Sequence, residues 1–122
     1  MKKPRIKWLR KPQKHDYPAA QAYLRLTFEP RAAKNLIDKL RRANITEFAA
    51  KDIFRASGLS LLGVSNSHVQ ERRTQIADSE ALSPLLLCRD TDRRKLIIAD
   101  GYHRLCAVYT FDEDAMIPCK IV

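Results

Sequence analysis

The residue types best suited to chemistry form one short run, Asp100-Gly101-Tyr102-His103-Arg104. An arginine has a planar set of donors that can hold two phosphate oxygens at once. A histidine can donate a hydrogen bond, or act as a general acid or base near neutral pH. We therefore take His103 and Arg104 as the candidate catalytic residues, and the whole run as a candidate anion-binding site.

The segments that flank this run predict the geometry of the site. Residues 95–99 predict a strand, and a helix is expected from the turn at Gly101 to about Phe111. Gly101 permits a backbone conformation at the turn that other residues avoid. The free N–H groups and the positive end of the helix dipole would then lie beside the histidine and the arginine, which suits a phosphate or another anion.

Each residue of the run also has a purely structural interpretation. Arg104 can form an ion pair with Asp100 or with Asp112 instead of holding a ligand. Asp100 can coordinate a magnesium ion beside a phosphate or cap the helix, and we favour capping. Tyr102 can stack on a nucleobase or lie half-exposed on the surface.

The remaining sequence predicts an α+β chain of one domain, 1–122, in three parts: a basic arm (1–15), a helical hairpin (16–44) and a mixed-sheet core (45–122). Asp16 is expected to cap the first helix of the hairpin, and Pro30 to begin the second. Ser67 and Gln70 predict a capping box. The core is expected to contain strands at 45–49, 84–88, 95–99 and 116–122, a helical turn at 51–56, a loop at 59–66 and a helix at 67–77.

Positive charge is concentrated in the first third of the chain. Residues 1–44 contain 13 lysines and arginines and 3 acidic residues, whereas residues 45–122 contain 10 and 11. A basic surface of this kind can contact DNA or RNA, or dock an acidic protein. Ile6 and Trp8 are expected to anchor the arm on the body of the protein.

Composition excludes several classes of protein. No apolar run approaches the roughly 20 residues that span a bilayer, so no membrane association is expected. The three cysteines, Cys88, Cys106 and Cys119, are odd in number and form no CxxC pair, which argues against disulfides and a zinc site. We expect them to be buried in a reduced, cytoplasmic protein, with no metal held by protein ligands alone.

Three segments of the core carry a resemblance to a known family. They are Pro84-Leu85-Leu86-Leu87, the residues Ile98 to Ala107 around the turn, and the closing strand Ile117 to Val122. Together with the order of the predicted elements, they resemble the ParB/sulfiredoxin superfamily over residues 45–122. ParB-type proteins have Gly-Glu-Arg-Arg at this turn, sulfiredoxins have Gly-Cys-His-Arg, and the free-serine kinases have Asp-Gly-His-His-Arg.

The resemblance implies that the turn binds nucleotide phosphates, with ATP or another nucleotide as cofactor, with or without magnesium. It also implies that the loop containing Asn66, Ser67 and His68 approaches the ligand, so these three are second-rank candidates for the binding site. Tyr102 replaces the catalytic cysteine of the sulfiredoxins, which argues against their chemistry. The serine kinases use a glutamate near this loop, for which Glu71 is a weak candidate. Arg72-Arg73 can reach a phosphate or form an exposed helix face, and we favour the exposed face.

The expected function is therefore nucleotide binding at the turn, with phosphoryl- or nucleotidyl-transfer activity as an open question because no complete catalytic set is visible. One alternative is a basic, non-catalytic module that binds DNA or RNA through residues 1–44. Another is a small component of a toxin or defence system.

Overall fold

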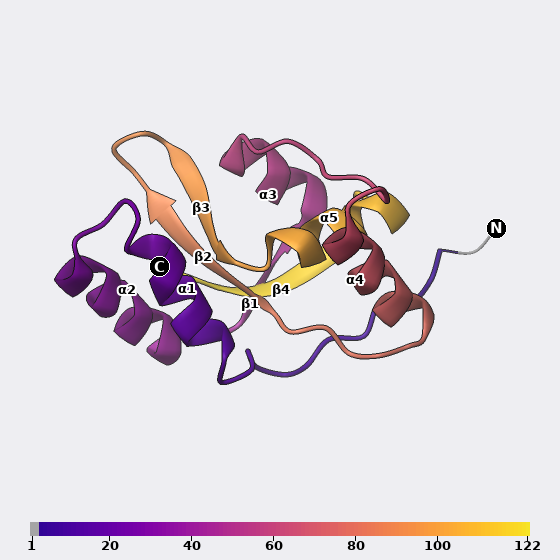
Figure 1. The fold of residues 1–122 in the computed structure, drawn as a ribbon, viewed down its shortest axis with the longest axis horizontal. Helices are drawn as coiled ribbons and strands as arrows, with labels where there is room; N and C mark the ends of the chain where they lie inside the picture. The colour runs from indigo at the N-terminus through magenta and orange to yellow at the C-terminus, as the bar shows by residue number, and fades with distance from the viewer. Residues whose placement is uncertain (1–2) are drawn as a thin grey trace.

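Five helices pack on the two faces of a four-stranded sheet in the computed structural model, which describes residues 3–122 (Figure 1). The fold is α+β. In chain order the elements are α1 (Asp16–Leu24), α2 (Pro30–Arg42), β1 (Thr46–Ala49), α3 (Ala50–Ser57), α4 (Ser67–Ala77), β2 (Leu85–Asp90), β3 (Lys95–Asp100), α5 (Tyr102–Phe111) and β4 (Met116–Ile121).

The sheet is mixed and has the strand order β1-β4-β2-β3. β1 pairs with β4, and β2 with β3, in antiparallel fashion, while the central pair β2–β4 is parallel. Residues 85–88 of β2 are buried, as their continuous apolar run predicts for a strand covered on both faces.

Alternation along β2 divides the interior into two clusters, because successive strand residues point to opposite faces. Leu85 and Leu87 belong to the cluster beneath α3, α4 and α5, whereas Leu86 and Cys88 belong to the cluster beneath α1 and α2. The apolar side of the helical hairpin is therefore not an appendage of the sheet. Together with the sheet it forms one of the two apolar clusters of the interior.

Several local expectations are confirmed. The two hairpin helices, the four strands, and the helices α4 and α5 all form, with bounds shifted by a few residues. The arm is anchored as expected. Trp8 forms a β-bridge with Leu82, and Trp8 and Ile6 both pack against the cluster beneath α3, α4 and α5. All three cysteines are buried. In the described part of the chain, no helix has both the length and the apolar character needed to cross a membrane.

The expected helix caps are wrong. His15, not Asp16, occupies the N-cap of α1, and the Asp16 carboxylate instead accepts hydrogen bonds from the Gln13 N–H (3.0 Å) and the Ser83 hydroxyl. Asn66, not Ser67, caps α4, because its side-chain oxygen accepts from two N–H groups of the first turn at 3.0 and 3.1 Å. Neighbouring Asn and Ser are both good caps, so sequence alone does not choose between them.

Asp100 does not cap α5 either. Gly101 occupies the N-cap position, so no side chain caps this helix. The Asp100 carboxylate is engaged elsewhere, in the site described next.

Candidate anion-binding site

The turn between β3 and α5 requires glycine for two reasons. Gly101 has a φ of 111°, in the region that favours glycine. A Cβ at this position would also lie 2.7 Å from Leu85 Cγ and 2.9 Å from Arg104 Nη2. The first backbone hydrogen bond of α5 runs from the Leu105 N–H to the Gly101 carbonyl at 2.9 Å, so the N–H groups before it have no acceptor within the helix.

A hollow of about 140 Å³ lies between this turn and the first half of α4. α4 and α5 lie side by side in Figure 1 and are in contact. The hollow brings together every candidate site residue except Asn66, which caps α4, and Ser67, which is exposed at the start of α4. Its lining residues are His68, Glu71, Arg72, Asp100, Gly101, Tyr102, His103 and Arg104.

Arg104 forms an ion pair with Asp100, which was one of the two structural alternatives for this arginine. Its Nη2 donates to the Asp100 carboxylate at 2.8 Å and approaches the Pro84 carbonyl at 3.5 Å. Asp112, the other alternative, pairs with Lys3 instead. One edge of the Arg104 guanidinium is therefore occupied by Asp100.

The two arginines in the hollow have unused donors. Among the described residues, the Nε atoms of Arg72 and Arg104 are buried and have no hydrogen-bond partner. Leaving a buried donor unpaired costs about 1–3 kcal/mol, and more when the group is charged. An anion that accepts from both atoms would remove that cost.

The expectation that Arg72-Arg73 form an exposed helix face is wrong. Arg72 lines the hollow, and Arg73 lies over the Phe111 ring, 4.1 Å from its centroid, with a hydrogen bond to the Thr110 hydroxyl. Once α4 is known to be helical, His68 and Arg72 share a face through their i, i+4 spacing. That spacing could have indicated that Arg72 lies on the same side of α4 as His68. It does not indicate which face of α4 packs against α5.

Two carboxylates also reach the hollow. Burial raises the pKa of Asp100 above its ordinary value, and this effect exceeds the opposing one of the Arg104 guanidinium. Glu71 is exposed and lies 3.5 Å from Arg72. Glu71 therefore does approach the candidate site, from the helix and not from the loop before it.

The rings of His68 and His103, which both line the hollow, are neighbours, with centroids 4.9 Å apart and planes tilted by 46°. Burial lowers the pKa of His103, and His68, Arg72 and Arg104 lower it further. His103 is therefore neutral at pH 7 and offers one donor and one acceptor. A bound anion would oppose these effects and favour its protonation.

Tyr102 supports the loop beside the hollow. Its hydroxyl donates to the Ser60 carbonyl, and its half-buried ring packs against the first apolar cluster. The tyrosine thus ties the 59–66 loop to the start of α5, in addition to lining the hollow with its ring.

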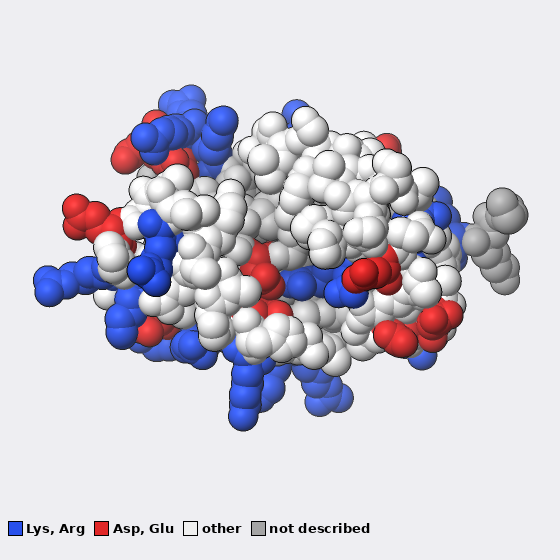
Figure 2. Space-filling model, viewed as in Figure 1, with Lys and Arg blue, Asp and Glu red and all other residues white. Residues whose placement is uncertain are grey.

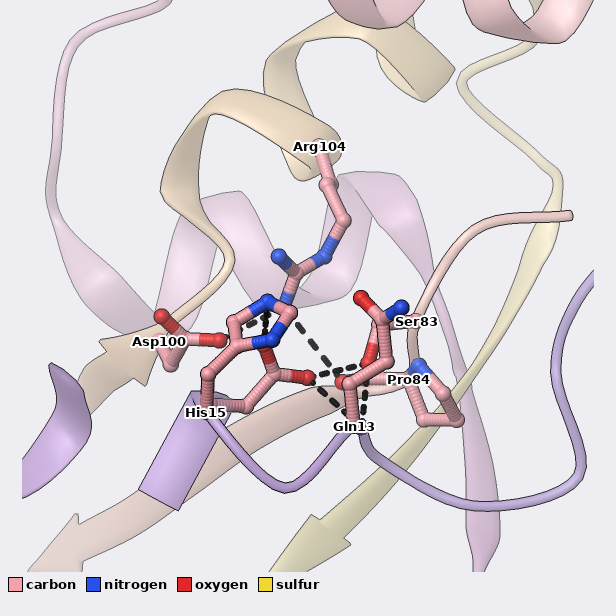
Figure 3. Close-up of polar contacts among 7 residues, drawn as sticks. Gln13, His15, Ser83, Pro84, Asp100 and Arg104 are labelled. Atoms are coloured by element: carbon pink, nitrogen blue, oxygen red, sulfur yellow. Dashed lines mark hydrogen bonds and ion pairs between the residues drawn. The ribbon is translucent and has the colours of Figure 1, made fainter. Parts of the chain in front are cut away.

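A buried polar network adjoins the ion pair on its other side (Figure 3). Asp16 is 2% exposed, and its second carboxylate oxygen lies 3.3 Å from His15 Nε2. The negative charge of Asp16 contributes to the raised pKa of Asp100. Sequence reasoning missed this network because the Ser83–Asp16 contact joins residues 67 positions apart, and no local pattern signals such a pairing.

A protein-ligated metal does not fit the site. Within residues 3–122, no cluster of three or more His, Cys, Asp or Glu side chains is arranged to hold a metal ion. One oxygen of Asp100 is already bound to Arg104. A magnesium ion here would have to be bound mainly by phosphate oxygens and water.

Comparisons with known proteins identify no relative from which a function could be inferred. No family model, no curated protein and no solved structure matches the chain. The turn, the two unpaired arginine donors and the neighbouring histidines are therefore the basis for a functional assignment.

Proposed function

We propose that this chain binds the phosphate groups of a nucleotide in the hollow between α4 and α5, and that residues 45–122 form a ParB/sulfiredoxin-like core. The observation that supports this most strongly is the pair of buried, unpaired Nε atoms on Arg72 and Arg104. They lie beside the start of α5, where free N–H groups and the helix dipole also favour an anion. The residues that carry these donors all line one small space.

The size of the hollow suits phosphate groups and not an entire nucleotide. Its volume of about 140 Å³ is well below the roughly 300–1,000 Å³ of sites that enclose a whole small molecule. The sugar and base would lie outside, against the loop that Tyr102 holds. That loop exposes Leu59, Leu61 and Val64, at 43%, 46% and 56%, which offers apolar surface to a base.

His103 is the residue placed to move a proton at the bound phosphate. Its lowered pKa keeps it neutral at pH 7, and a phosphoryl group at the helix start would lie within its reach. Arg72 and Arg104 would then balance the charge of the phosphate oxygens. Any transfer reaction would use magnesium brought with the nucleotide, because residues 3–122 contain no group of three or more side chains arranged to hold a metal ion.

A thermal-shift titration tests the binding. Pyrophosphate, ADP, ATP and CTP at millimolar concentration, each with and without magnesium, should raise the melting temperature by several degrees, because a ligand that binds only the folded state stabilises it. Arg72→Gln, at a partly exposed position, should keep the fold and abolish the gain, as should Arg104→Ala. Arg93→Gln removes a charge outside the hollow and should retain the full gain.

An unchanged melting temperature with all four ligands would overturn the proposal. So would an equal gain in the Arg72→Gln and Arg93→Gln proteins, because the stabilisation would then come from non-specific charge effects.

A second candidate function is nucleic-acid binding through residues 3–44. It is favoured because most of the acidic side chains in this segment are buried or paired. Asp16 is buried and Asp38 is paired with Lys34, so Glu29 alone opposes the basic side chains there. Lysines and arginines project from the end and the lower edge of the molecule near α2 and the arm (Figure 2). This charge would support a salt-dependent attraction to phosphate backbones.

The test must leave the apolar anchors of the arm in place. Replacing Lys7, Arg10, Lys11 and Lys14 with glutamine keeps Ile6 and Trp8 packed, and it should reduce the slope of log affinity against log salt for duplex DNA or RNA. The same number of glutamines at Arg55, Arg93, Arg94 and Lys95 provides the control. An equal effect of both sets would exclude the arm as the contact surface.

A further inference from the structure

A second and larger hollow, of about 450 Å³, lies on the sheet face that α3 covers. It shares no lining residue with the hollow at the 100–104 turn. Arg89, Leu96 and Ile121 come from the ends of three neighbouring strands, and α3 forms the adjoining wall. Since α3 has only eight residues, it leaves this end of the sheet open.

The floor and walls of the groove are apolar. Phe48, Ile53, Leu96 and Ile121 provide its hydrocarbon surface, and Phe48 is 37% exposed. The volume falls within the range of sites that bind small organic molecules. Covering these side chains with a hydrocarbon ligand would remove apolar surface from water.

The rim of the groove is positively charged. Arg89, Arg94 and Lys95 line it, and none of them forms an ion pair within residues 3–122. Of the two acidic residues on the rim, Asp90 is paired with Arg93 at 3.2 Å, which leaves Asp52 as the remaining counter-charge. The basic side chains at the tip of the β2–β3 hairpin stand beside the uncharged surface over α3 in Figure 2.

Arg94 is the last residue of the β2–β3 turn and has a φ of 52°, a backbone conformation that recurs at the ends of hairpin turns. The turn places its side chain on the rim of the groove.

We propose that this groove binds an organic anion of small-molecule size. The hydrocarbon body of the ligand lies on Phe48, Leu96 and Ile121, and its carboxylate or equivalent group lies at the rim among Arg89, Arg94 and Lys95. The charge of the rim excludes cations of the same shape, and the apolar floor excludes small hydrophilic anions.

Three probes of one shape test both parts of the proposal: 2-naphthoate, the neutral 2-naphthamide and the cation 2-naphthylmethylammonium. Binding is followed through the ¹H–¹⁵N NMR spectrum of the intact chain. 2-Naphthoate should cause saturable shifts in residues 48–56, 89–96 and 121. It should bind about threefold to fivefold more tightly than the amide, as expected for ion pairs at an exposed rim, and the cation should bind most weakly.

Variants assign the effect to the groove. Phe48→Ala should weaken both the anion and the amide, whereas Arg89→Gln and Lys95→Gln should weaken only the anion. Arg94→Gly should raise the melting temperature by relieving the backbone and should also weaken the anion. Arg55→Gln, which removes an exposed charge of α3 outside the groove, is the matched control and should change neither affinity.

Two results would overturn the proposal. One is a set of shifts centred outside the groove, and the other is equal affinity for the anion and the amide in a protein whose spectrum remains well dispersed. Failure of nucleotide binding at the 100–104 turn would leave this test unaffected, because the two hollows share no residue.

Discussion

At the scale of single residues, the site depends on how Arg104 divides its donors. One guanidinium nitrogen holds Asp100 at 2.8 Å, while the Nε is buried without a partner. Sequence reasoning identified both residues, because their types suit phosphate chemistry and a glycine turn lies between them. It kept Arg72 only as the less favoured alternative and did not identify Asp16 as a neighbour, because those positions depend on how distant elements pack.

Asp100→Asn should strengthen anion binding. The carboxylate competes with a phosphate for Arg104 and repels its charge, so its removal should raise pyrophosphate affinity by about fivefold to tenfold, as measured by calorimetry. The amide oxygen can still accept from the guanidinium, so the loss in unfolding free energy should be about 1–2 kcal/mol.

Asp90→Asn, which also removes an ion-paired carboxylate but lies outside the hollow, should leave the affinity unchanged. If Asp100 instead coordinates magnesium at the phosphates, Asp100→Asn would weaken binding when magnesium is present. That result would contradict the role assigned here.

The protonation of His103 should be coupled to the anion. Burial and the neighbouring positive charges hold its pKa below the ordinary 6.5. The unfolded chain therefore takes up this proton at a higher pH than the folded one, and the free energy of unfolding should fall as pH drops below about 6.5. Sulfate, which does not titrate in this range, should raise the pKa of His103.

The ring-proton shifts of His103, followed by NMR across pH 4–8 with and without sulfate, measure this coupling directly. His103→Asn should abolish the corresponding pH dependence of sulfate affinity. An unchanged His103 pKa in saturating sulfate would show that the anion binds out of reach of the imidazole.

At the scale of the elements, local sequence patterns predicted most helices and strands. The positions at which these elements begin and end were predicted least well. Proline at the start of α2 and the apolar run of β2 are unambiguous signals. The cap of α4 is not, since Asn66 and Ser67 are adjacent and both are good caps. The decisive element is the β3–α5 turn, whose geometry depends on one residue.

Gly101→Ala should destabilise the protein by about 1–3 kcal/mol, because the φ of 111° is unfavourable for alanine and the new methyl group would meet Leu85. Chemical denaturation measures the loss. Gly63→Ala is the matched control: its Cβ would meet nothing within 4 Å, so stability should change by less than about 0.5 kcal/mol. Equal effects at both glycines would contradict the strained geometry of the turn.

At the scale of the whole molecule, the sheet separates two interiors that were not predictable from the sequence. The apolar face of the helical hairpin was recognised by its periodicity, but its partner was not. Leu86, Cys88 and Ala99 form that partner surface on the sheet. Pairing between elements so far apart depends on the strand order, which no local pattern encodes.

Removal of residues 1–44 should therefore prevent folding of the remainder. The truncation would expose a continuous apolar sheet face, and the fragment 45–122 should show no cooperative thermal transition by circular dichroism and poor dispersion by NMR. Removal of residues 1–5 alone, which spares Ile6 and Trp8, should leave a cooperative transition. A fragment 45–122 that melts like the intact chain would contradict the shared interior.

The central position of β4 has a consequence for synthesis on the ribosome. β1 is an edge strand whose partner is β4, and β4 also links β1 to β2 and β3. The nascent chain must therefore wait until residues 116–121 leave the exit tunnel before β1 can pair. Until then, the β2–β3 hairpin and the N-terminal helices are the parts able to associate, and half-made chains would expose the apolar strands that a chaperone recognises.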